Sequence, residues 1–314
     1  MDITTDKTSF LAIGDLHLRR ACPAMRIDDF FQTLERKLED ILYYAEYEYQ
    51  CAGVIFPGDV FDRPDAPYSL VEWAMQKLWA HDLLYFFVFG QHDLRYHTRD
   101  FSNTPLGVLC TGLPGKGHIL CADSPLLVQT PNSNVAFWGC SWGDGLPKKA
   151  IPGKLNIAVM HRPVTVEKLP WEHKDLITAE ELVRACPMDL FITGDNHTQF
   201  CADYENASVI NLGSVMRTTI AQTNHQPKMA IISLLGEAEY EYTLKKLPIR
   251  KNVFDEQAVE EQKEKESQLA DFIASLGGEF DPELRFIDNL RMAAKTAPEN
   301  VRLVIDEVMR LADQ

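Results

Sequence analysis

Residues 9–17 read Ser9-Phe10-Leu11-Ala12-Ile13-Gly14-Asp15-Leu16-His17, an apolar run that ends in an aspartate and a histidine. A short apolar run punctuated by glycine is typical of a buried strand. Asp15 and His17 are of the residue types that bind divalent metals. One such cluster could arise by chance, because a lone histidine after a strand is more often a hydrogen-bonded structural residue than a ligand.

The same arrangement recurs four more times along the chain. Apolar runs over 53–56, 83–89, 155–159 and 189–193 each precede a polar cluster. In order, these clusters are Gly58-Asp59, Gly90-Gln91-His92-Asp93, Met160-His161 and Gly194-Asp195-Asn196-His197. Five clusters in one local context indicate a single shared site.

Amphipathic helical patterns separate the predicted strands. Over 26–48, apolar residues recur with a period of about 3.6 and charged residues fill the opposite face. Residues 68–81 repeat this pattern, with Pro67 near the first turn. Strands that alternate with helices predict an α/β fold with parallel crossovers, and the loops at the carboxyl ends of such strands converge on one edge. Ligands far apart in the sequence are therefore expected to meet.

The clustered side chains are suited to more than one metal ion. Carboxylates and imidazoles together hold Mn²⁺, Fe²⁺ or Zn²⁺, whereas a set of oxygens alone suits Mg²⁺ or Ca²⁺. A carboxylate can also bridge two ions about 3.5–4 Å apart, the usual clamp for cleaving phosphate esters. The candidate ligands are Asp15, His17, Asp59, Gln91, His161, Asp195 and His197. These are too many for one ion.

In order and strand context, the clusters resemble those of the calcineurin-like metallophosphoesterases. That family's motifs are D-x-H, GD, GNH followed by D or E, H, and GHxH, and the resemblance extends over roughly residues 8–235. It implies an α/β fold, a four-layer αββα sandwich, with two divalent ions at its edge. The first ion would be held by Asp15, His17, Asp59 and His197, and the second by Asp59, Gln91, His161 and Asp195. Mn²⁺ is the expected metal, with Fe²⁺, Zn²⁺ and Mg²⁺ as alternatives.

The resemblance also assigns roles outside the ligand set. His92 occupies the place of the family histidine near the leaving group, where a protonated imidazole neutralises or protonates the departing oxygen. Asp62 occupies the place of a carboxylate that orients this histidine and favours its charged form. Arg63 is a candidate phosphate contact, a role better supported among phosphatases of the family than among nucleases. A strand-end turn with a surface ion pair is the alternative for Asp62 and Arg63.

Two ligand positions depart from the family pattern. Gln91 stands where the family has Asn, so the amide oxygen lies one methylene farther from the backbone. Asp195 stands where the family usually has His, which adds a negative charge. Harder ligands and a lower positive charge should favour manganese over zinc and weaken the activation of water. Loss of activity is an alternative, although both replacements keep a donor atom.

A second passage bears on the substrate. Residues 211–217, Asn211-Leu212-Gly213-Ser214-Val215-Met216-Arg217, resemble the passage that follows GHxH in SbcD-type DNA nucleases. The implied activity is a DNA exonuclease or endonuclease of recombination or repair, in which a metal-bridging hydroxide attacks phosphorus in line. A stand-alone phosphatase or phosphodiesterase acting on a protein or a small phosphoester is the second reading. An inactive metal-binding scaffold is the third.

The composition changes near residue 250. We expect a catalytic domain over 1–250 and a helical carboxyl-terminal region over 251–314, where apolar stripes follow the charge run 260–266. By resemblance, this region would dock on the coiled-coil base of an SbcC-like ATPase. A helical appendage that packs on the sandwich is the alternative, and a homodimer is left open.

Net charge and cysteine content indicate which partners and which cellular compartment to expect. The 314-residue chain carries a net charge of −15, which argues against a broad nonspecific grip on DNA. Arg19, Arg20, Arg63 and Arg162 are the candidate substrate contacts near the clusters. The seven cysteines show no C-x-x-C spacing, and no signal peptide or membrane span is recognised. We expect a cytoplasmic protein with no membrane partner.

Overall fold

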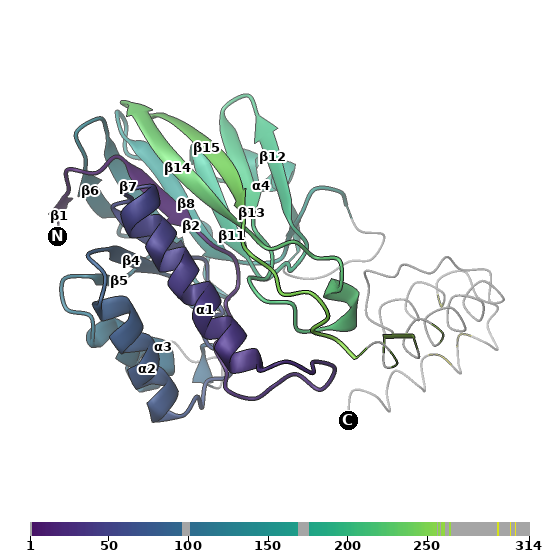
Figure 1. The fold of residues 1–314 in the computed structure, drawn as a ribbon. Helices are drawn as coiled ribbons and strands as arrows, with labels where there is room; N and C mark the ends of the chain where they lie inside the picture. Colours follow the sequence, from purple (N-terminus) through teal and green to yellow (C-terminus); the bar gives the residue numbers. More distant parts are fainter. Residues whose placement is uncertain are drawn as a thin grey trace.

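The computed structural model describes residues 2–95, 101–168 and 176–255, together with residues 257, 259, 260, 264, 294, 302 and 305. Two large β-sheets pack face to face within these residues (Figure 1). Apart from the seven isolated positions, the helices expected after residue 255 lie outside the described residues. The proposed division at residue 250 therefore stays a prediction.

The first sheet has six strands in the order β15-β14-β2-β3-β4-β5. Their bounds are β2 (Ser9–Ala12), β3 (Gly53–Phe56), β4 (Leu84–Phe87), β5 (Gly117–Ile119), β14 (Lys228–Gly236) and β15 (Glu239–Lys246). Strands β2 to β5 are parallel, whereas β14 and β15 run antiparallel to their neighbours. The carboxyl ends of β2, β3 and β4 therefore lie at the same edge of this sheet.

The second sheet has seven strands in the order β1-β6-β7-β8-β11-β13-β12. Their bounds are β1 (Asp2–Thr4), β6 (Leu126–Gln129), β7 (Asn134–Cys140), β8 (Leu155–His161), β11 (Leu190–Gly194), β12 (Phe200–Tyr204) and β13 (Ala207–Asn211). Strands β7, β8, β11 and β13 are parallel. A separate pair is formed by β9 (Val164–Thr165) and β10 (Ile177–Thr178).

Aromatic rings from both sheets fill the space between them. Phe137 of β7 lies 4.6 Å from Phe86 of β4 and 5.1 Å from Phe10 of β2, measured between ring centroids. All three side chains are fully buried. Burial of one such ring stabilises a fold by about 1.5–3 kcal/mol, so this cluster holds the two sheets together.

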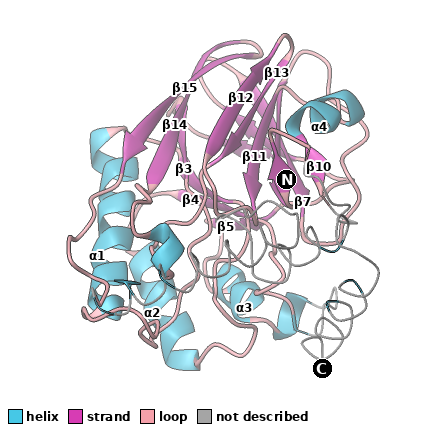
Figure 2. Ribbon diagram, turned by 90° about the vertical axis from the view of Figure 1, so that its right-hand side faces the viewer, coloured by secondary structure: helices cyan, strands magenta, loops and turns pink. Residues whose placement is uncertain are grey.

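Helices cover the outer face of each sheet. On the first sheet lie α1 (Phe30–Tyr43) with its π-helical extension η1 (Tyr44–Glu48), α2 (Tyr68–Trp79) and α3 (Pro105–Thr111), and on the second lies α4 (Ala179–Ala185). Figure 2 shows α1 and α4 on opposite sides of the sheets. The short 3₁₀ turns are η3 (Phe101–Asn103) and η4 (Ile220–Gln222). The architecture is the expected αββα sandwich. No helix in the described part of the chain is both long and apolar enough to cross a bilayer.

The first helix starts later than its sequence pattern suggests. The pattern begins at Arg26, but α1 begins at Phe30 because the Asp29 side chain accepts a hydrogen bond from Gln32 N at 3.0 Å and caps the helix. Ile27 consequently lies outside the helix and is 65% exposed. The apolar stripe of α1 is formed by residues from Phe30 onward.

Candidate metal centre

The candidate ligands lie on loops at the carboxyl ends of strands from both sheets. Asp15, Asp59 and Gln91 follow β2, β3 and β4 of the first sheet. His161 ends β8 of the second sheet, and Asp195 directly follows β11. Asp195 N donates a hydrogen bond to Asp15 Oδ2 at 3.0 Å, which joins the loops of the two sheets. The site thus forms where the edges of two sheets meet, whereas the strand pattern alone had suggested a single sheet.

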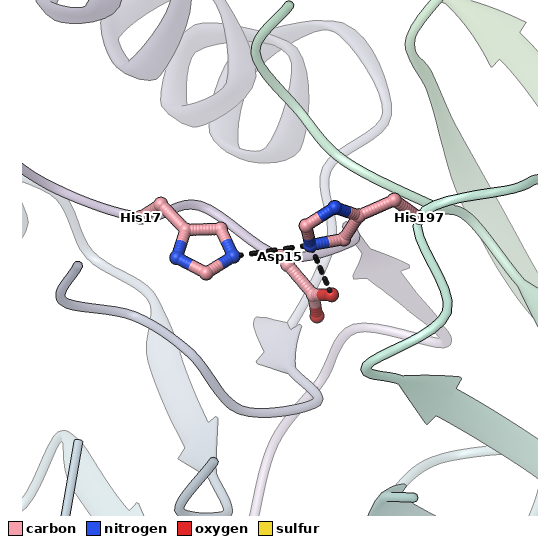
Figure 3. A group of neighbouring side chains, drawn as sticks. All are labelled: Asp15, His17 and His197. Atoms are coloured by element: carbon pink, nitrogen blue, oxygen red, sulfur yellow. Dashed lines mark hydrogen bonds and ion pairs between the residues drawn. The ribbon is translucent and has the colours of Figure 1, made fainter. Parts of the chain in front are cut away.

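Asp15, His17, Asp59 and His197 form the first ligand set. His17 Nε2 lies 3.2 Å from His197 Nε2, and His197 Nε2 lies 3.6 Å from Asp15 Oδ2 (Figure 3). Asp59 Oδ2 lies 3.8 Å from His17 Nε2. Two atoms that bind one ion at about 2.0–2.2 Å each are separated by about 3–4 Å. Ligand atoms of Asp15, His17 and His197 all lie within 4.8 Å of one another, a spacing that fits one divalent ion, and Asp59 adjoins this group through His17.

Asp59, Gln91, His161 and Asp195 form the second ligand set. His161 Nε2 lies 3.3 Å from Asp59 Oδ2 and 3.8 Å from Asp195 Oδ1. Its other ring nitrogen, Nδ1, donates to the Pro57 carbonyl at 2.8 Å, so Nε2 is the ring nitrogen that faces the carboxylates. Gln91 Nε2 donates to Asp195 Oδ1 at 2.7 Å. The carboxylate oxygens of Asp59 and Asp195 thus both lie within 4 Å of His161 Nε2, whereas the Gln91 atom nearest Asp195 is the amide nitrogen, which does not bind a cation.

Several buried side-chain atoms that could bind a metal lack a hydrogen bond. Asp15 Oδ1, Gln91 Oε1 and His161 Nε2 are each buried and form none in the described part of the chain. A buried polar atom without a partner costs about 1–3 kcal/mol. Asp15 Oδ1 and Gln91 Oε1 carry lone pairs, and His161 Nε2 gains one when it loses its proton, so divalent cations are partners that fit all three atoms.

The protonation of the site reflects its crowded negative charge. Burial raises the pKa of Asp15 well above its usual range, and the nearby Asp59 and Asp195 carboxylates raise it further. Burial opposes the charged form of His161, but Asp59 and the other two carboxylates raise the pKa of His161 to about 10. Burial lowers the pKa of His17 to about 3. Without a cation the three carboxylates repel one another, and a divalent ion would relieve that repulsion.

Glycines let the ligand loops approach one another closely. Gly58 has a φ of +105°, and a Cβ atom there would collide with the ring of His161. A Cβ atom on Gly90 would collide with the side chain of Asp59. The glycines of the GD and GQHD motifs are therefore required by the packing of the ligands as well as by the turns.

His92 lies beside the ligand sets with one ring nitrogen fixed. Its Nδ1 donates to the Asp62 carbonyl at 2.9 Å, and its backbone N–H donates to Asp59 Oδ1 at 3.0 Å. The side chain is exposed, and Nε2 makes no described hydrogen bond. Ligand atoms of His17, Asp59 and His92 also lie within 4.8 Å of one another, so a role as a ligand is geometrically compatible too.

Asp62 contacts His92 differently from what the sequence had suggested. The contact comes from the Asp62 backbone carbonyl, whereas the carboxylate was expected to orient the ring. The carboxylate instead pairs with Arg19 at 3.2 Å, and its Oδ1 lies 3.7 Å from His17 Nδ1. The Arg19 guanidinium draws the carboxylate away, so Asp62 is placed to support a ligand of the first set.

The four candidate substrate arginines have different surroundings. Arg19 pairs with Asp62, and Arg20 lies over the Phe31 ring with Arg20 Nη2 3.4 Å from the Ser69 carbonyl oxygen. Arg63 forms an exposed pair with Asp65, whose Oδ1 lies 3.0 Å from Arg63 Nε, and does not join the ligand sets. Arg162 is partly buried directly after His161.

Two positioning residues were missed at the sequence level. The fully buried Asp93 accepts hydrogen bonds from Val60 N, Phe61 N and Gly90 N at 2.9–3.2 Å, and so ties the loop after β3 to the loop after β4. Burial, reinforced by Asp59, raises the pKa of Asp93 to about 7. Asn211 Nδ2 donates to the Asn196 and Thr198 carbonyls at 2.7 and 2.6 Å, which shapes the loop that carries His197. The position of Asp93 within its motif was the available signal.

Comparison with solved structures gives distant similarities. A putative 5'-nucleotidase from Staphylococcus aureus is 13% identical, with 82% of this chain and 58% of that chain covered and a TM-score of 0.49. The sulfate thiohydrolase SoxB of Thermus thermophilus is 12% identical, with 85% and 61% covered and a TM-score of 0.46. An archaeal phosphodiesterase is 11% identical, with 76% and 99% covered and a TM-score of 0.40. The chain thus spans 58% of the nucleotidase's length, and these values carry no inference about a substrate.

Comparison with sequence families gives a definite assignment. No curated protein matches the chain. The profile of the calcineurin-like phosphoesterases matches residues 8–199, which is more than half of the chain and includes every candidate ligand. The chain therefore belongs to the calcineurin-like phosphoesterase family.

Proposed function

We propose that the protein is a phosphodiesterase that uses two divalent metal ions and acts on DNA as an exonuclease or endonuclease. The position of Asp59 carries the hydrolytic part of this proposal. Its Oδ2 lies 3.8 Å from His17 Nε2 and 3.3 Å from His161 Nε2, so the carboxylate stands between the two ligand sets. A carboxylate shared by two ions needs this position. Membership of the family supports metal-dependent hydrolysis of a phosphoester.

The protein's own side chains supply positioning and proton transfer. The bound ions would polarise the phosphoryl oxygens and activate water. The hydrogen bond from Nδ1 to the Asp62 carbonyl fixes the His92 ring and leaves Nε2 at the exposed side of the site. A protonated Nε2 there donates its proton to the departing oxygen. General acid catalysis of this kind contributes about 10²–10⁴-fold.

An open site supports a polymeric substrate. The side chain of His197 is 45% exposed, and His92 is exposed as well, so a long chain can reach the ligand sets from solvent. Arg19, paired with Asp62 beside His17, provides a cation near the first ligand set, and Arg162 directly follows His161 in the sequence. The net charge of −15 is unfavourable for holding DNA without help, and a partner subunit would supply the remaining contacts.

The passage over 211–217, which resembles that of SbcD-type nucleases, packs on the site. The Gly213 carbonyl accepts a hydrogen bond from Asp15 N at 3.0 Å, and Val215 N donates to the Asp15 carbonyl at 2.9 Å. The passage thus fixes the backbone of Asp15 from both sides. The passage therefore does more than connect two strands, and its resemblance to SbcD-type nucleases is what supports the nuclease role.

Hydrolysis of a small phosphoester or a phosphoprotein is the second candidate, favoured by the acidic net charge. The pairing of exposed Arg63 with Asp65 speaks against it, because Arg63 was the phosphate contact that this reading used. A metal-binding scaffold without catalysis is the third candidate. It predicts bound ions and no turnover.

Activity measurements on purified full-length protein separate these candidates. With Mn²⁺, we expect cleavage of linear DNA and slower cleavage of a chromogenic phosphodiester, and the reverse preference would favour the second candidate. His92→Asn should lower turnover by about 10²–10⁴-fold while metal analysis still finds two ions. A protein that binds the ions but cleaves neither substrate is a scaffold, and one that binds less than one ion contradicts the proposal.

We further propose a cytoplasmic complex with an SbcC-like ATPase, docked through residues 251–314. All seven cysteines are free, which supports a reducing compartment. The full-length chain should copurify with an ATPase encoded beside it. Val304→Asp, in the apolar stripe that the sequence predicts, should abolish copurification without changing metal content.

A further inference from the structure

Gln91 and Asp195 are the two ligand positions at which the chain departs from the family pattern, and they touch each other. Gln91 Nε2 lies 2.7 Å from Asp195 Oδ1, although the two residues are 104 positions apart in the sequence. One follows β4 of the first sheet and the other follows β11 of the second. The two replacements therefore form one contact across the site.

This contact fixes which way the Gln91 amide faces. An ionised carboxylate only accepts hydrogen bonds, so the amide nitrogen must point at Asp195, and the reverse orientation would oppose two oxygens. Gln91 Oε1 is then directed elsewhere, and it is buried with no hydrogen bond in the described part of the chain. Its lone pairs are available to a cation.

The carboxylate that fixes the amide is itself held in place. Asp195 N donates to Asp15 Oδ2 at 3.0 Å, and Asp195 adopts a φ of +81°, a region that non-glycine residues rarely occupy. Asp195 Oδ1 also lies 3.8 Å from His161 Nε2. Asp195 is thus fixed from its backbone and directed at the second ligand set.

The pairing explains how a longer side chain can serve at position 91. Glutamine has one more rotatable bond than asparagine, and ordering a long side chain costs up to about 2 kcal/mol. A charge-assisted hydrogen bond offsets a cost of this size. The hydrogen bond to Asp195 therefore limits the conformations of the Gln91 side chain, as the shorter side chain limits those of an asparagine.

We propose that Gln91 and Asp195 act as one hydrogen-bonded unit that orients the amide oxygen toward the second ion and makes this position prefer Mn²⁺ over Zn²⁺. The inference rests on the two-ion site of the proposed function. An amide oxygen and a carboxylate suit Mn²⁺, whereas an imidazole at position 195 would suit Zn²⁺. Neither replacement is expected to work well alone.

Calorimetric titration of metal-free protein with Mn²⁺ and with Zn²⁺ tests the unit without relying on activity. Gln91→Asn shortens the amide and loses the hydrogen bond, and Asp195→His removes the carboxylate that orients it. Each single variant should bind the second Mn²⁺ about 10–100-fold more weakly. The double variant restores the usual family pair, so it should recover two-ion binding with a preference shifted toward Zn²⁺.

Matched substitutions away from the site serve as controls. Gln76→Asn shortens an exposed glutamine whose Nε2 lies 3.4 Å from Glu72 Oε1, and Asp203→His alters an exposed aspartate that contacts Tyr242. Neither should change metal binding. If Asp195→His fails to fold, Asp195→Asn keeps the size of the side chain but can present either an oxygen or an NH₂ group to Gln91 and removes the negative charge, so the Gln91 amide is held less strictly and the second Mn²⁺ should bind more weakly.

The outcomes separate this inference from the proposed function. A double variant whose loss of Mn²⁺ affinity equals the combined loss of the two singles, with no gain for Zn²⁺, would overturn the unit while leaving the two-ion site intact. Wild-type protein that binds fewer than two ions would overturn the site itself, and the unit with it. Rescue in the double variant, with inverted metal preference, would establish the coupling.

Discussion

The two ligand sets share Asp59 but differ in exposure and composition. The first set opens to solvent through His197, whose side chain is 45% exposed, and it keeps the residues of the family pattern. The second is buried at His161, which is 0% exposed, and contains both replacements, which are themselves partly exposed. The two replaced residues contact each other, so in the second set a change at one position alters the surroundings of the other.

Replacing Asp59, the residue that both sets share, tests this comparison most severely. Asp59→Asn keeps the shape of the side chain but removes the charge that faces both sets. Loss of both ions should lower phosphodiesterase activity by about 10³-fold or more, because two-ion stabilisation of the reaction is worth several kcal/mol. Steady-state kinetics and metal analysis measure this. A variant that keeps both ions would mean that the sets are independent.

A larger side chain at position 58 should disturb the second ligand set more than the first. Gly58→Ala would drive a Cβ atom into the His161 ring, so we expect the second ion to bind at least about 10-fold more weakly and stability to fall by about 2–3 kcal/mol. Titration with Mn²⁺ and chemical denaturation provide the measurements.

Gly143→Ala is the matched control for the effect of backbone strain. Gly143 has a φ of +80°, but nothing lies within 4 Å of a Cβ atom placed there. It should cost about 1 kcal/mol and leave metal binding unchanged. Equal effects at the two glycines would attribute the Gly58 result to backbone strain alone.

The ease of predicting the site from sequence differs between its parts. The local context of each cluster was enough to place the candidate ligands at strand ends that meet in the structure, and β3 has the predicted bounds of 53–56. The left-handed backbone at His17, Asp59 and Asp195 could not be foreseen, because it depends on loops packed against one another. Nor could the contact between Gln91 and Asp195 be foreseen, since the two residues lie on loops that follow strands of different sheets.

Protonation should distinguish the histidines of the two sets. The pKa of His161 is raised to about 10, so the metal-free ring carries a proton at neutral pH. A bound ion must displace this proton. Affinity for the second ion should therefore rise by about tenfold per pH unit from pH 6 to 9. His17, lowered to a pKa of about 3, has no proton to release in this range.

Calorimetry in buffers of different ionisation enthalpy counts the protons released. Wild-type protein should release a proton as the second ion binds, and His161→Asn should abolish that release. Affinity for the second ion that does not vary with pH would contradict the assignment of His161 as a ligand in competition with protons.

The smallest expected effect concerns the support of the first set. Arg19→Ala frees the Asp62 carboxylate near His17, and because the Arg19 side chain is 26% exposed the change should cost only about 0.2–1 kcal/mol of stability. Affinity for the first ion should fall a few-fold. Arg63→Ala removes the more exposed pair with Asp65 and should change neither quantity. If Arg19→Ala and Arg63→Ala had equal effects, Asp62 would have no role in supporting the first ligand set.

Anomalous diffraction from a crystal grown in Mn²⁺ tests the central claim most directly. We expect two peaks about 3.5–4 Å apart with the Asp59 carboxylate between them, His17 and His197 on one ion, and His161, Asp195 and Gln91 Oε1 on the other. A single peak, or Asp59 turned away from both ions, would contradict the two-ion account.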